Sequence, residues 1–331
     1  MRPLSALTSK GRARRLRPLA LAALAQYPVV PRRLRLIGNS WNCVFRVDTA
    51  DGPLVLRVGL PTSAGDGSRV RAEAEFLLAL TRAGSVLVPT PRANRDGLFV
   101  TTASAPGVPE PRHCVLFTWV PGIDLAQAIT PERWSLLGGL MARLHTFAEG
   151  WTPPTALPIP RHDRLFHRGE PCVLFDAQHA HRFSAARIAA LRQAVELADA
   201  RTQQIWAREP SIVTHGDLHQ WNVKLHRGSL HPIDFEDLLH SPPILDVATS
   251  LYYVHRRPDF PALRASFQAG YSALRPWVER EPGELTPLIL ARGLELLNVC
   301  LFDPEIGPAA IGPLIPRVAD DAANLIETLA G

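Results

Sequence analysis

The chain has 331 residues, of which 46% are hydrophobic and 20% charged, and its formal net charge is +5. These values are typical of a folded protein with one large or two medium domains, and they exclude a disordered chain. No apolar run approaches the roughly 20 residues that cross a bilayer, so we expect a cytoplasmic protein with no membrane part. The cysteines, Cys43, Cys114, Cys172 and Cys300, form no CxxC pair. They therefore predict buried free thiols rather than a zinc ribbon or a disulfide framework.

The positive charge is concentrated near the N-terminus. Residues 1–47 hold ten Lys or Arg and no acidic residue, and Lys10–Arg17 is the most basic run. Such a run could contact nucleic acid, but because no aromatic residues are interleaved we interpret it as a solvated helix face. From residue 123 on, the chain holds 19 basic and 24 acidic residues. The C-terminal part is therefore mildly acidic.

The first third of the chain predicts a small sheet with a helix inserted. Arg14–Tyr27 is rich in Leu and Ala and predicts a helix that ends at Pro28, and apolar spacing predicts a second helix over Arg69–Leu80. A hairpin turn is predicted at Ala50-Asp51-Gly52. Strands are predicted at Leu34–Ile37, Cys43–Asp48, Leu54–Val58, Val86–Pro91, Leu98–Thr102 and Val115–Val120.

After Gly122 the pattern becomes mostly helical. Thr130-Pro131 is a helix start, with a capping residue followed by proline at the first helical position. One β-rich segment, Ile212–Phe235, lies among the helices. The other predicted helices are Ser184–Trp206, Phe260–Leu274, Leu285–Cys300 and Ala319–Leu329. We expect the domain boundary at the strand end Phe117–Gly122.

The β-rich segment carries the residues that indicate chemistry. Asp217 is followed five residues later by Asn222, and Asp234 comes after a predicted hairpin. Burying two acids and an amide among apolar strands is costly unless they pair with a charged partner. Carboxylate and amide oxygens suit Mg²⁺ together with phosphate oxygens. Protein kinases combine Asp-x₄-Asn with a later Asp-Phe-Gly, and this chain has Asp-x₄-Asn and then Asp234-Phe235-Glu236.

The two-part pattern HGDLHQWNV (215–223) and PIDFED (232–237) resembles the signature of the aminoglycoside, choline and homoserine phosphotransferases. The resemblance extends over most of the chain. Leu36–Val47 resembles the nucleotide-covering loop with its strands, Leu54–Val58 the third strand, and Leu116–Gly122 the hinge. Asp246-Val247-Ala248 resembles the segment that supports the catalytic loop, and Ala291-Arg292-Gly293 resembles part of the C-terminal helices.

The resemblance implies an α+β, two-lobed protein-kinase-like fold. A small β-rich N-terminal lobe would span residues 1–118, and a mostly helical C-terminal lobe residues 119–331, with the hinge at about 117–122. ATP would bind between the lobes. The implied reaction is transfer of the γ-phosphate from Mg²⁺-bound ATP to a hydroxyl of a small molecule such as an amino sugar or amino alcohol.

The resemblance also implies a role for each site residue. Asp217 would orient and deprotonate the acceptor hydroxyl, and Asn222 and Asp234 would hold Mg²⁺. Arg57 would reach the α/β-phosphates and pair with Glu73. Nucleotide contacts would also come from Asn42 in the covering loop and from the backbone of Thr118 and Val120.

The chain departs from the pattern in the nucleotide-binding part. Arg57 stands where protein kinases carry Lys, and Arg binds phosphate bidentately but is bulkier. The loop Gly38–Asn42 has a single glycine. Glu75 is an alternative partner for Arg57. Because Glu73 and Glu75 are two residues apart on the predicted helix, they point to different faces of it. On an edge strand, Arg57 could also simply face solvent.

Other interpretations stay open. His215, Asp217 and His219 alternate, so on one face of a strand they could ligate a transition metal. His215 is otherwise expected to bond loop backbone, Asp246 to support the loop, and His145 to cap or pack its helix. The acidic C-terminal part would suit a cationic acceptor. A protein Ser/Thr acceptor, a nucleotide-binding pseudokinase and a nucleic-acid-binding N-terminus are the alternative functions, and the sequence does not indicate ATP against GTP or the oligomeric state.

Overall fold

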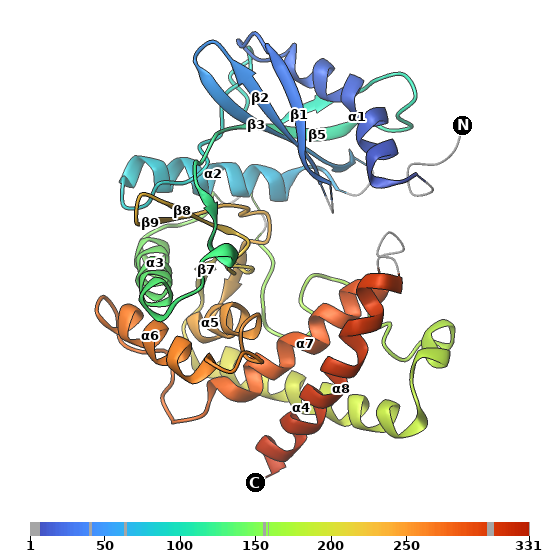
Figure 1. Cartoon of the computed structure of the whole chain (residues 1–331), viewed down its shortest axis with the longest axis vertical. Helices are drawn as coiled ribbons and strands as arrows, with labels where there is room; N and C mark the ends of the chain where they lie inside the picture. Colours follow the sequence, from blue (N-terminus) through green and yellow to red (C-terminus); the bar gives the residue numbers. More distant parts are fainter. Residues whose placement is uncertain are drawn as a thin grey trace. The chain divides into compact units, whose positions relative to one another are not determined.

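The computed structural model describes residues 7–39, 42–62, 65–154, 157, 159–302 and 308–330, and the chain divides into two compact units (Figure 1). The N-terminal unit comprises Met1–Gly122 and Thr152–Pro158, and the C-terminal unit comprises Ile123–Trp151 and Ile159–Gly331. The N-terminal unit extends beyond residue 118, where we expected it to end. Trp119 belongs to this unit, and Arg46 of the same unit stacks on its ring (4.6 Å).

The N-terminal unit is built on an antiparallel five-stranded sheet with the order β1-β2-β3-β5-β4. Its strands are β1 (Arg33–Asn39), β2 (Cys43–Thr49), β3 (Gly52–Pro61), β4 (Thr101–Ala103) and β5 (Arg112–Thr118). The predicted hairpin turn is present, because Thr49 pairs with Gly52. Strand β3 is central in the sheet, so Arg57 does not lie on an edge strand.

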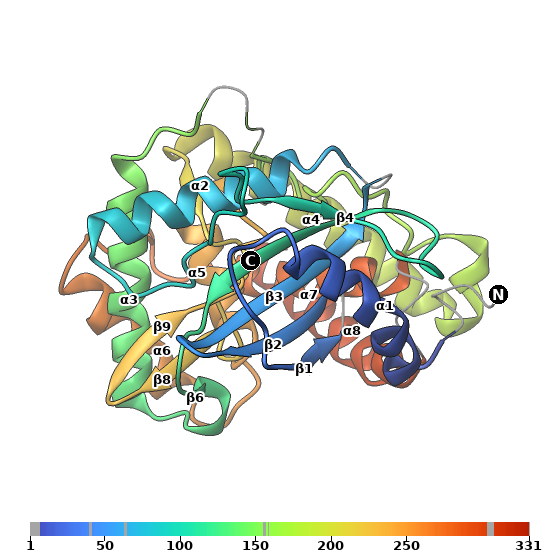
Figure 2. The ribbon, with the colours of Figure 1, turned by 90° about the horizontal axis from the view of Figure 1, so that it is seen from above.

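Two helices cover opposite faces of this sheet (Figure 2). Helix α1 (Ser9–Leu24) packs its Leu16 and Leu19 into one cluster with Leu56 and Val58 of β3. Because side chains alternate along a strand, Arg57 points to the other face, where helix α2 (Ser68–Ala83) lies. Helix α1 starts earlier than predicted because the Thr8 hydroxyl caps it, accepting from the Gly11 N–H (3.2 Å).

The predicted strand Val86–Pro91 is wrong. The segment runs beside β5, but only Pro91 forms a bridge, with Phe117. Pro89 and Pro91 have no backbone N–H and so cannot donate to a ladder. The next predicted strand, Leu98–Thr102, is replaced by the shorter and slightly later β4 (Thr101–Ala103).

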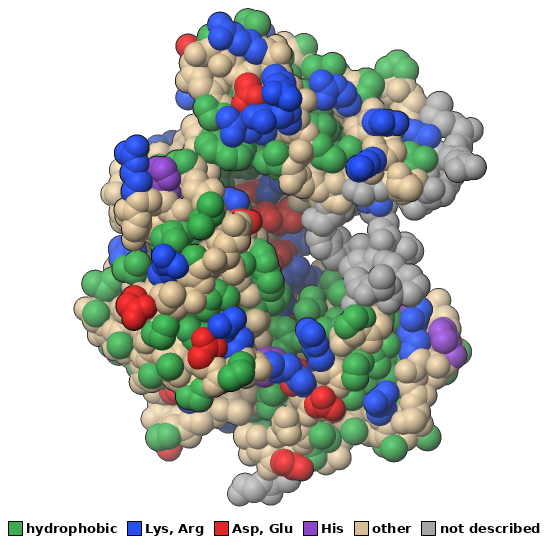
Figure 3. Space-filling model, viewed as in Figure 1, with side chains coloured by type: hydrophobic (Ala, Val, Ile, Leu, Met, Phe, Trp, Pro, Cys, Tyr) green, Lys and Arg blue, Asp and Glu red, His purple; other side chains and the backbone are tan. Residues whose placement is uncertain are grey.

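The outer surface of the N-terminal unit is rich in arginine (Figure 3). Part of this charge is neutralised locally, because Asp48 pairs with Arg35 (3.1 Å) and Arg46 (2.7 Å). Arg46 also stacks on the Trp119 ring, 4.6 Å from its centroid. The basic character therefore belongs to an ordered sheet surface as well as to helix α1.

The C-terminal unit is mostly helical and carries two small sheets, β6-β8-β9 and β7-β10. Its strands are β6 (Ile123–Asp124), β7 (Ile212–Thr214), β8 (Val223–His226), β9 (Ser229–Pro232) and β10 (Leu239–Ser241). Its helices are α3 (Pro131–Glu149), α4 (Ala185–Arg208), α5 (Pro243–Tyr252), α6 (Phe260–Ser272), α7 (Leu285–Phe302) and α8 (Pro308–Ala330). Helices α4, α7 and α8 enclose its main hydrophobic core.

Helix α7 is, by length and composition alone, apolar enough to cross a membrane, and it is the one such helix among the described residues. In this structure 72% of it is buried within the protein. Three buried polar residues, Arg292, Glu295 and Asn298, recur every third position along it. A spacing of three places neighbours on one face, so this core helix has a polar side.

Candidate active site

The three residues predicted to carry the chemistry lie together around one loop and one hairpin. The loop follows β7 and contains Asp217 and Asn222. In the hairpin Val223 pairs with Pro232, and the Ile233 N–H donates to the Asn222 carbonyl (2.8 Å), so Asp234 follows directly beside Asn222. The Asn222 side-chain amide donates to the Asp217 carbonyl (3.0 Å) and to its carboxylate Oδ2 (3.3 Å).

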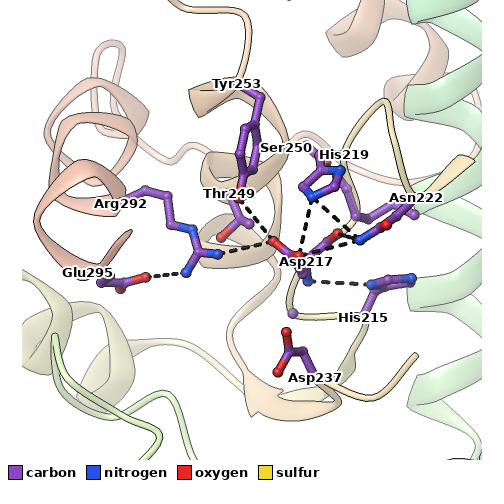
Figure 4. Close-up of polar contacts among 12 residues, drawn as sticks. His215, Asp217, His219, Asn222, Asp237, Thr249, Ser250, Tyr253, Arg292 and Glu295 are labelled. Atoms are coloured by element: carbon purple, nitrogen blue, oxygen red, sulfur yellow. Dashed lines mark hydrogen bonds and ion pairs between the residues drawn. The ribbon is translucent and has the colours of Figure 1, made fainter. Parts of the chain in front are cut away.

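The Asp217 carboxylate is held from several sides (Figure 4). Oδ1 accepts from Arg292 Nη2 (3.0 Å) and from the Tyr253 hydroxyl (3.2 Å). Oδ2 lies 3.2 Å from His219 Nε2. Burial alone would raise the pKa of this carboxyl, but the hydrogen bond and charge of His219 and the charges of Arg292 and Arg168 hold the pKa well below its usual range. Asp217 is therefore an ionised, fixed carboxylate at neutral pH.

The backbone beneath Asp217 is fixed by a chain of buried hydrogen bonds. The Gly216 N–H donates to Asp246 Oδ1 (3.0 Å), and Asp246 Oδ2 lies 3.0 Å from His145 Nε2. The other ring nitrogen of His145 lies 2.8 Å from the Tyr271 hydroxyl. Asp246 thus supports the loop, as expected. His145 does not cap α3; it connects α3 with the start of α5 and the end of α6.

Gly216 cannot be replaced without moving this loop. Its φ is +77°, in the left-handed region that glycine favours. A Cβ at this position would lie 2.1 Å from the Asp237 carbonyl oxygen. Close contact between the loop that contains Gly216 and the segment that contains Asp237 therefore sets the position of Asp217.

The transition-metal interpretation of His215, Asp217 and His219 is wrong in this structure. The three residues lie in a loop and not on one face of a strand, since β7 ends at Thr214. His215 Nε2 lies 3.1 Å from the Ile233 carbonyl, and the Asp217 N–H donates to Nδ1 (3.4 Å). Burial lowers the pKa of His215, which fits a neutral ring that bonds loop backbone.

The donor set around Asn222 and Asp234 fits a hard divalent cation. The side-chain Nδ2 of Asn222 points to Asp217. The side-chain Oδ1 of Asn222 accepts no hydrogen bond from the described residues. The exposed Asp234 has a φ of +66°, which is unusual for a residue with a side chain. Such backbone strain concentrates at functional positions. One amide oxygen and one carboxylate at the end of a hairpin match the ligands that Mg²⁺ prefers.

In the N-terminal unit the structure pairs Arg57 with Glu73 and not with Glu75. Arg57 Nη1 donates to Glu73 Oε1 (2.9 Å), and Nη2 contacts the other oxygen, so the pair is bidentate. Both side chains are buried, with 7% and 2% of their surface exposed. The Arg57 guanidinium also lies 5.3 Å from the centroid of the Phe117 ring.

The other residues predicted to bind the nucleotide are described only in part. Asn39 still pairs with Cys43, and residues 40–41 of the predicted covering loop lie outside the described part of the chain. Asn42 is half-buried. The Thr118 N–H is already bonded to Thr90, whereas the N–H of the buried Val120 has no partner among the described residues.

Sequence reasoning missed two residues that contact Asp217. Tyr253 follows α5, and Arg292 lies on α7, 36 and 75 positions from Asp217 in the sequence. For Arg292 a signal was present, because a charged residue in the most apolar predicted helix must have a buried partner. Tyr253 carried no comparable signal.

Comparison with known proteins agrees with this site. The model of the phosphotransferase enzyme family matches residues 33–283. No curated protein sequence matches the chain. Among solved structures, a microcompartment-associated aminopropanol kinase is 23% identical, with a TM-score of 0.73 over 93% of this chain and 96% of that one.

Two further structures share the fold at lower identity. The first is an amicoumacin kinase in complex with AMP-PNP, Ca²⁺ and its ligand Ami (15% identity, TM-score 0.71, 91% of both chains). The second is a spectinomycin phosphotransferase in complex with ADP and spectinomycin (13% identity, TM-score 0.63, 98% of this chain and 99% of that one). The chain is therefore a phosphotransferase: it belongs to the phosphotransferase enzyme family and has the protein-kinase-like α+β fold that its sequence predicted.

Proposed function

We propose that the protein is an ATP- and Mg²⁺-dependent kinase that transfers the γ-phosphate to a hydroxyl of a small molecule. The observation that supports this most directly is the arrangement of Asp217, Asn222 and Asp234 at one loop and one hairpin end. This arrangement provides a fixed carboxylate next to oxygen ligands for a cation. Phosphoryl transfer requires these two elements.

In this proposal Asp217 acts mainly by position. Its lowered pKa makes it a weak proton acceptor. A weak base is sufficient, because the transition state of phosphoryl transfer is loose and the hydroxyl proton can leave late. The contacts of Arg292, Tyr253 and His219 fix the carboxylate oxygens, and this fixed geometry would align an acceptor hydroxyl for in-line attack.

Asn222 and Asp234 would hold Mg²⁺, which when bound neutralises charge on the transferring phosphate. Arg57, oriented by Glu73, would contact the α/β-phosphates. Val120 can donate its N–H to the adenine ring, whereas Thr118 can offer only its carbonyl oxygen. Asn42 would contact the nucleotide from the covering loop.

The class of acceptor is proposed from the structural neighbours and from the charge of the C-terminal part. The structural neighbours include enzymes named for aminopropanol, amicoumacin and spectinomycin. An amino alcohol or amino sugar would suit the acidic balance of the C-terminal part. The cationic Arg292 already contacts Asp217, however, so any ammonium group would bind at a distance from this carboxylate. None of the four cysteines, all of which lie in the described part of the chain, is in a disulfide, and this fits a reducing cytoplasm.

The test is ATP consumption with Mg²⁺ across amino alcohols, aminoglycosides, homoserine, sugars and a generic protein substrate. We expect turnover with a small-molecule acceptor. Asp217→Asn should lower kcat by about 10²-fold or more. The matched control is Asp320→Asn, the same substitution at an exposed position on α8, which should leave kcat unchanged.

Two outcomes would contradict the proposal. Phosphorylation of the protein substrate alone would indicate a Ser/Thr kinase. ATP binding without turnover on any acceptor, equal in wild type and Asp217→Asn, would indicate a pseudokinase that regulates a partner.

A further inference from the structure

A second group of buried ionisable side chains lies in the C-terminal unit, on the polar side of α7. It consists of His162 and His167, from the irregular segment between residues 159 and 173, and Glu295 from α7. Each of the three is at most 7% exposed. None of them is needed for the phosphotransferase chemistry described above, so the group requires its own explanation.

Two of the distances within this group lie near those around a tetrahedral metal ion. His162 Nε2 lies 3.1 Å from Glu295 Oε1, and His167 Nδ1 lies 3.8 Å from the same oxygen. Bonds of about 2.0–2.1 Å to Zn²⁺ place neighbouring tetrahedral ligand atoms about 3.3–3.4 Å apart. One candidate ligand atom of each residue lies within 4.8 Å of the others. The two rings lie 3.8 Å apart between centroids with 34° between their planes, so they would have to turn for one nitrogen of each to point at the same ion.

The ring of His167 has one unsatisfied nitrogen. Its Nδ1 lies 3.3 Å from the Leu165 carbonyl, a contact that it would give up on ligating an ion, whereas its buried Nε2 has no hydrogen-bond partner among the described residues. A buried ring nitrogen without a partner is costly, and a water molecule at Nε2 would remove this cost.

Outer contacts already fix the candidate ligands. Arg292 Nη1 donates to Glu295 Oε2 (2.7 Å), which leaves Oε1 to face the two imidazoles. The backbone N–H of His162 donates to the His240 carbonyl (2.8 Å), and the backbone N–H of Leu165 donates to Asp199 Oδ1 (2.8 Å), so the segment that carries the two histidines is held in place. The contact of Arg292 with Glu295 Oε2 is of the kind that orients a carboxylate ligand in metal sites.

We propose that His162, His167 and Glu295 form a binding site for Zn²⁺ or a chemically similar transition-metal ion, with water as the fourth ligand. Two imidazoles and one carboxylate favour such an ion over Mg²⁺, which prefers oxygen ligands. The site is thus chemically distinct from Asn222 and Asp234. Because Arg292 contacts both Glu295 and Asp217, the ion would also steady the support of the catalytic carboxylate.

The test uses the full-length protein without an affinity tag, stripped with a chelator and titrated with Co²⁺. We expect one Co²⁺ per chain with the visible absorption of a tetrahedral site, displacement by Zn²⁺ and a rise in Tm. His167→Gln should weaken Co²⁺ binding at least about tenfold, since even outer partners of a metal site contribute 10–100-fold. The control His181→Gln, the same change at an exposed position, should bind like the wild type.

Binding of Mg²⁺ with an ATP analogue provides an independent readout, and His167→Gln should retain it. Wild-type protein that shows neither the Co²⁺ absorption nor a Tm shift would overturn the proposal, and the three residues would then form a hydrogen-bonded cluster only. Unchanged Co²⁺ affinity in a folded His167→Gln variant would overturn it as well. If that variant does not fold, the wild-type titration alone decides.

Discussion

At the scale of single residues, the Asp217 carboxylate already has a partner on each oxygen. Arg292 and Tyr253 occupy Oδ1, while Asn222 and His219 lie at Oδ2. An incoming hydroxyl must share an oxygen with one of these groups. The Tyr253 hydroxyl is the partner most easily replaced, because it is uncharged and an acceptor hydroxyl makes the same kind of bond.

The Arg57–Glu73 pair allows a quantitative prediction. Removing one member of a buried ion pair leaves the other charge without compensation, which costs about 3–5 kcal/mol. We expect Arg57→Met to lower the free energy of unfolding by that amount, and Glu73→Leu to do the same. The double variant should lie closer to the wild type than either single variant, since no buried charge remains. Urea unfolding of the four proteins gives the coupling free energy.

The control for this cycle is the exposed pair Arg257 and Asp259, whose side chains are 41% and 42% exposed. Arg257→Met should change the free energy of unfolding by less than about 1 kcal/mol, as exposed pairs do. Additive single effects at Arg57 and Glu73 would contradict the prediction.

At the scale of elements, the sequence predicted amphipathic and capped helices best. The Thr130-Pro131 start of α3 is confirmed, and the Thr130 hydroxyl accepts from the Arg133 N–H (3.3 Å). Helix α5 was not predicted, because nine of its ten residues are buried and its polar residues Asp246 and Ser250 face the catalytic loop and not solvent. The N-terminal half of α8 was missed because Pro313 and Pro316 lie inside it.

Tertiary burial explains why α8 forms despite these prolines. Its buried residues recur at helical spacing, and all of them pack into the core with α4 and α7. They are Ile311, Ile315, Val318, Ala322 and Leu325. Local propensity predicted a break in the helix, and the apolar contacts outweigh it.

Helices α3 and α6 cross at two glycines, and this crossing can be tested. A Cβ at Gly138 would lie 2.0 Å from the Phe267 carbonyl oxygen, and a Cβ at Gly270 would lie 1.8 Å from the Ser135 carbonyl oxygen. We expect Gly138→Ala or Gly270→Ala to cost about 1–3 kcal/mol or more, as overpacking does. Forcing the helices apart should also reduce kcat, because α3 and α6 carry His145 and Tyr271. Urea unfolding and steady-state kinetics measure the two effects.

Gly139, next to Gly138 on α3, is the matched control for these variants. A Cβ there would lie 3.4 Å from the Gly270 carbonyl oxygen, an ordinary van der Waals contact, so Gly139→Ala should change the free energy of unfolding by less than about 1 kcal/mol. If Gly138→Ala were as stable as the wild type, the close crossing would not constrain this part of the fold.

At the scale of the whole molecule, a short signature predicted the fold and the central residues of the site. The two-part pattern around Asp217 and Asp234 predicted a kinase-like α+β fold, and the likeness to solved structures confirms it. The residues that fix Asp217 could not be predicted in the same way. Tyr253 and Arg292 reach it only after α5 and α7 have packed, so their role depends on tertiary structure and not on local spacing.

Several histidines make the stability of the whole molecule depend on pH. Burial is the main cause that lowers the pKa of His179, His215, His231 and His240 below the ordinary value of 6.5. Below pH 6.5 the unfolded chain therefore binds more protons than the folded chain at these positions. Stability contributed by the neutral rings is fully present above pH 6.5 and is lost as the pH falls towards their folded pKa values, by up to about 1.4 kcal/mol per histidine and pH unit.

Carboxylates do not change this expectation between pH 7.5 and 5.5. Carboxyls whose pKa is lowered in the folded chain, such as Glu295, have an ordinary pKa of 4.5 or below. Above that pH their contribution to stability is complete and does not change. We therefore expect the urea midpoint, measured with a chelator present, to fall between pH 7.5 and 5.5. His215→Gln should flatten this dependence, since it removes one titrating ring, whereas the exposed His181→Gln should leave the dependence as in the wild type. A midpoint that stays constant over this range would show that these rings titrate alike in the folded and unfolded chains, and that their burial does not exclude the charged form.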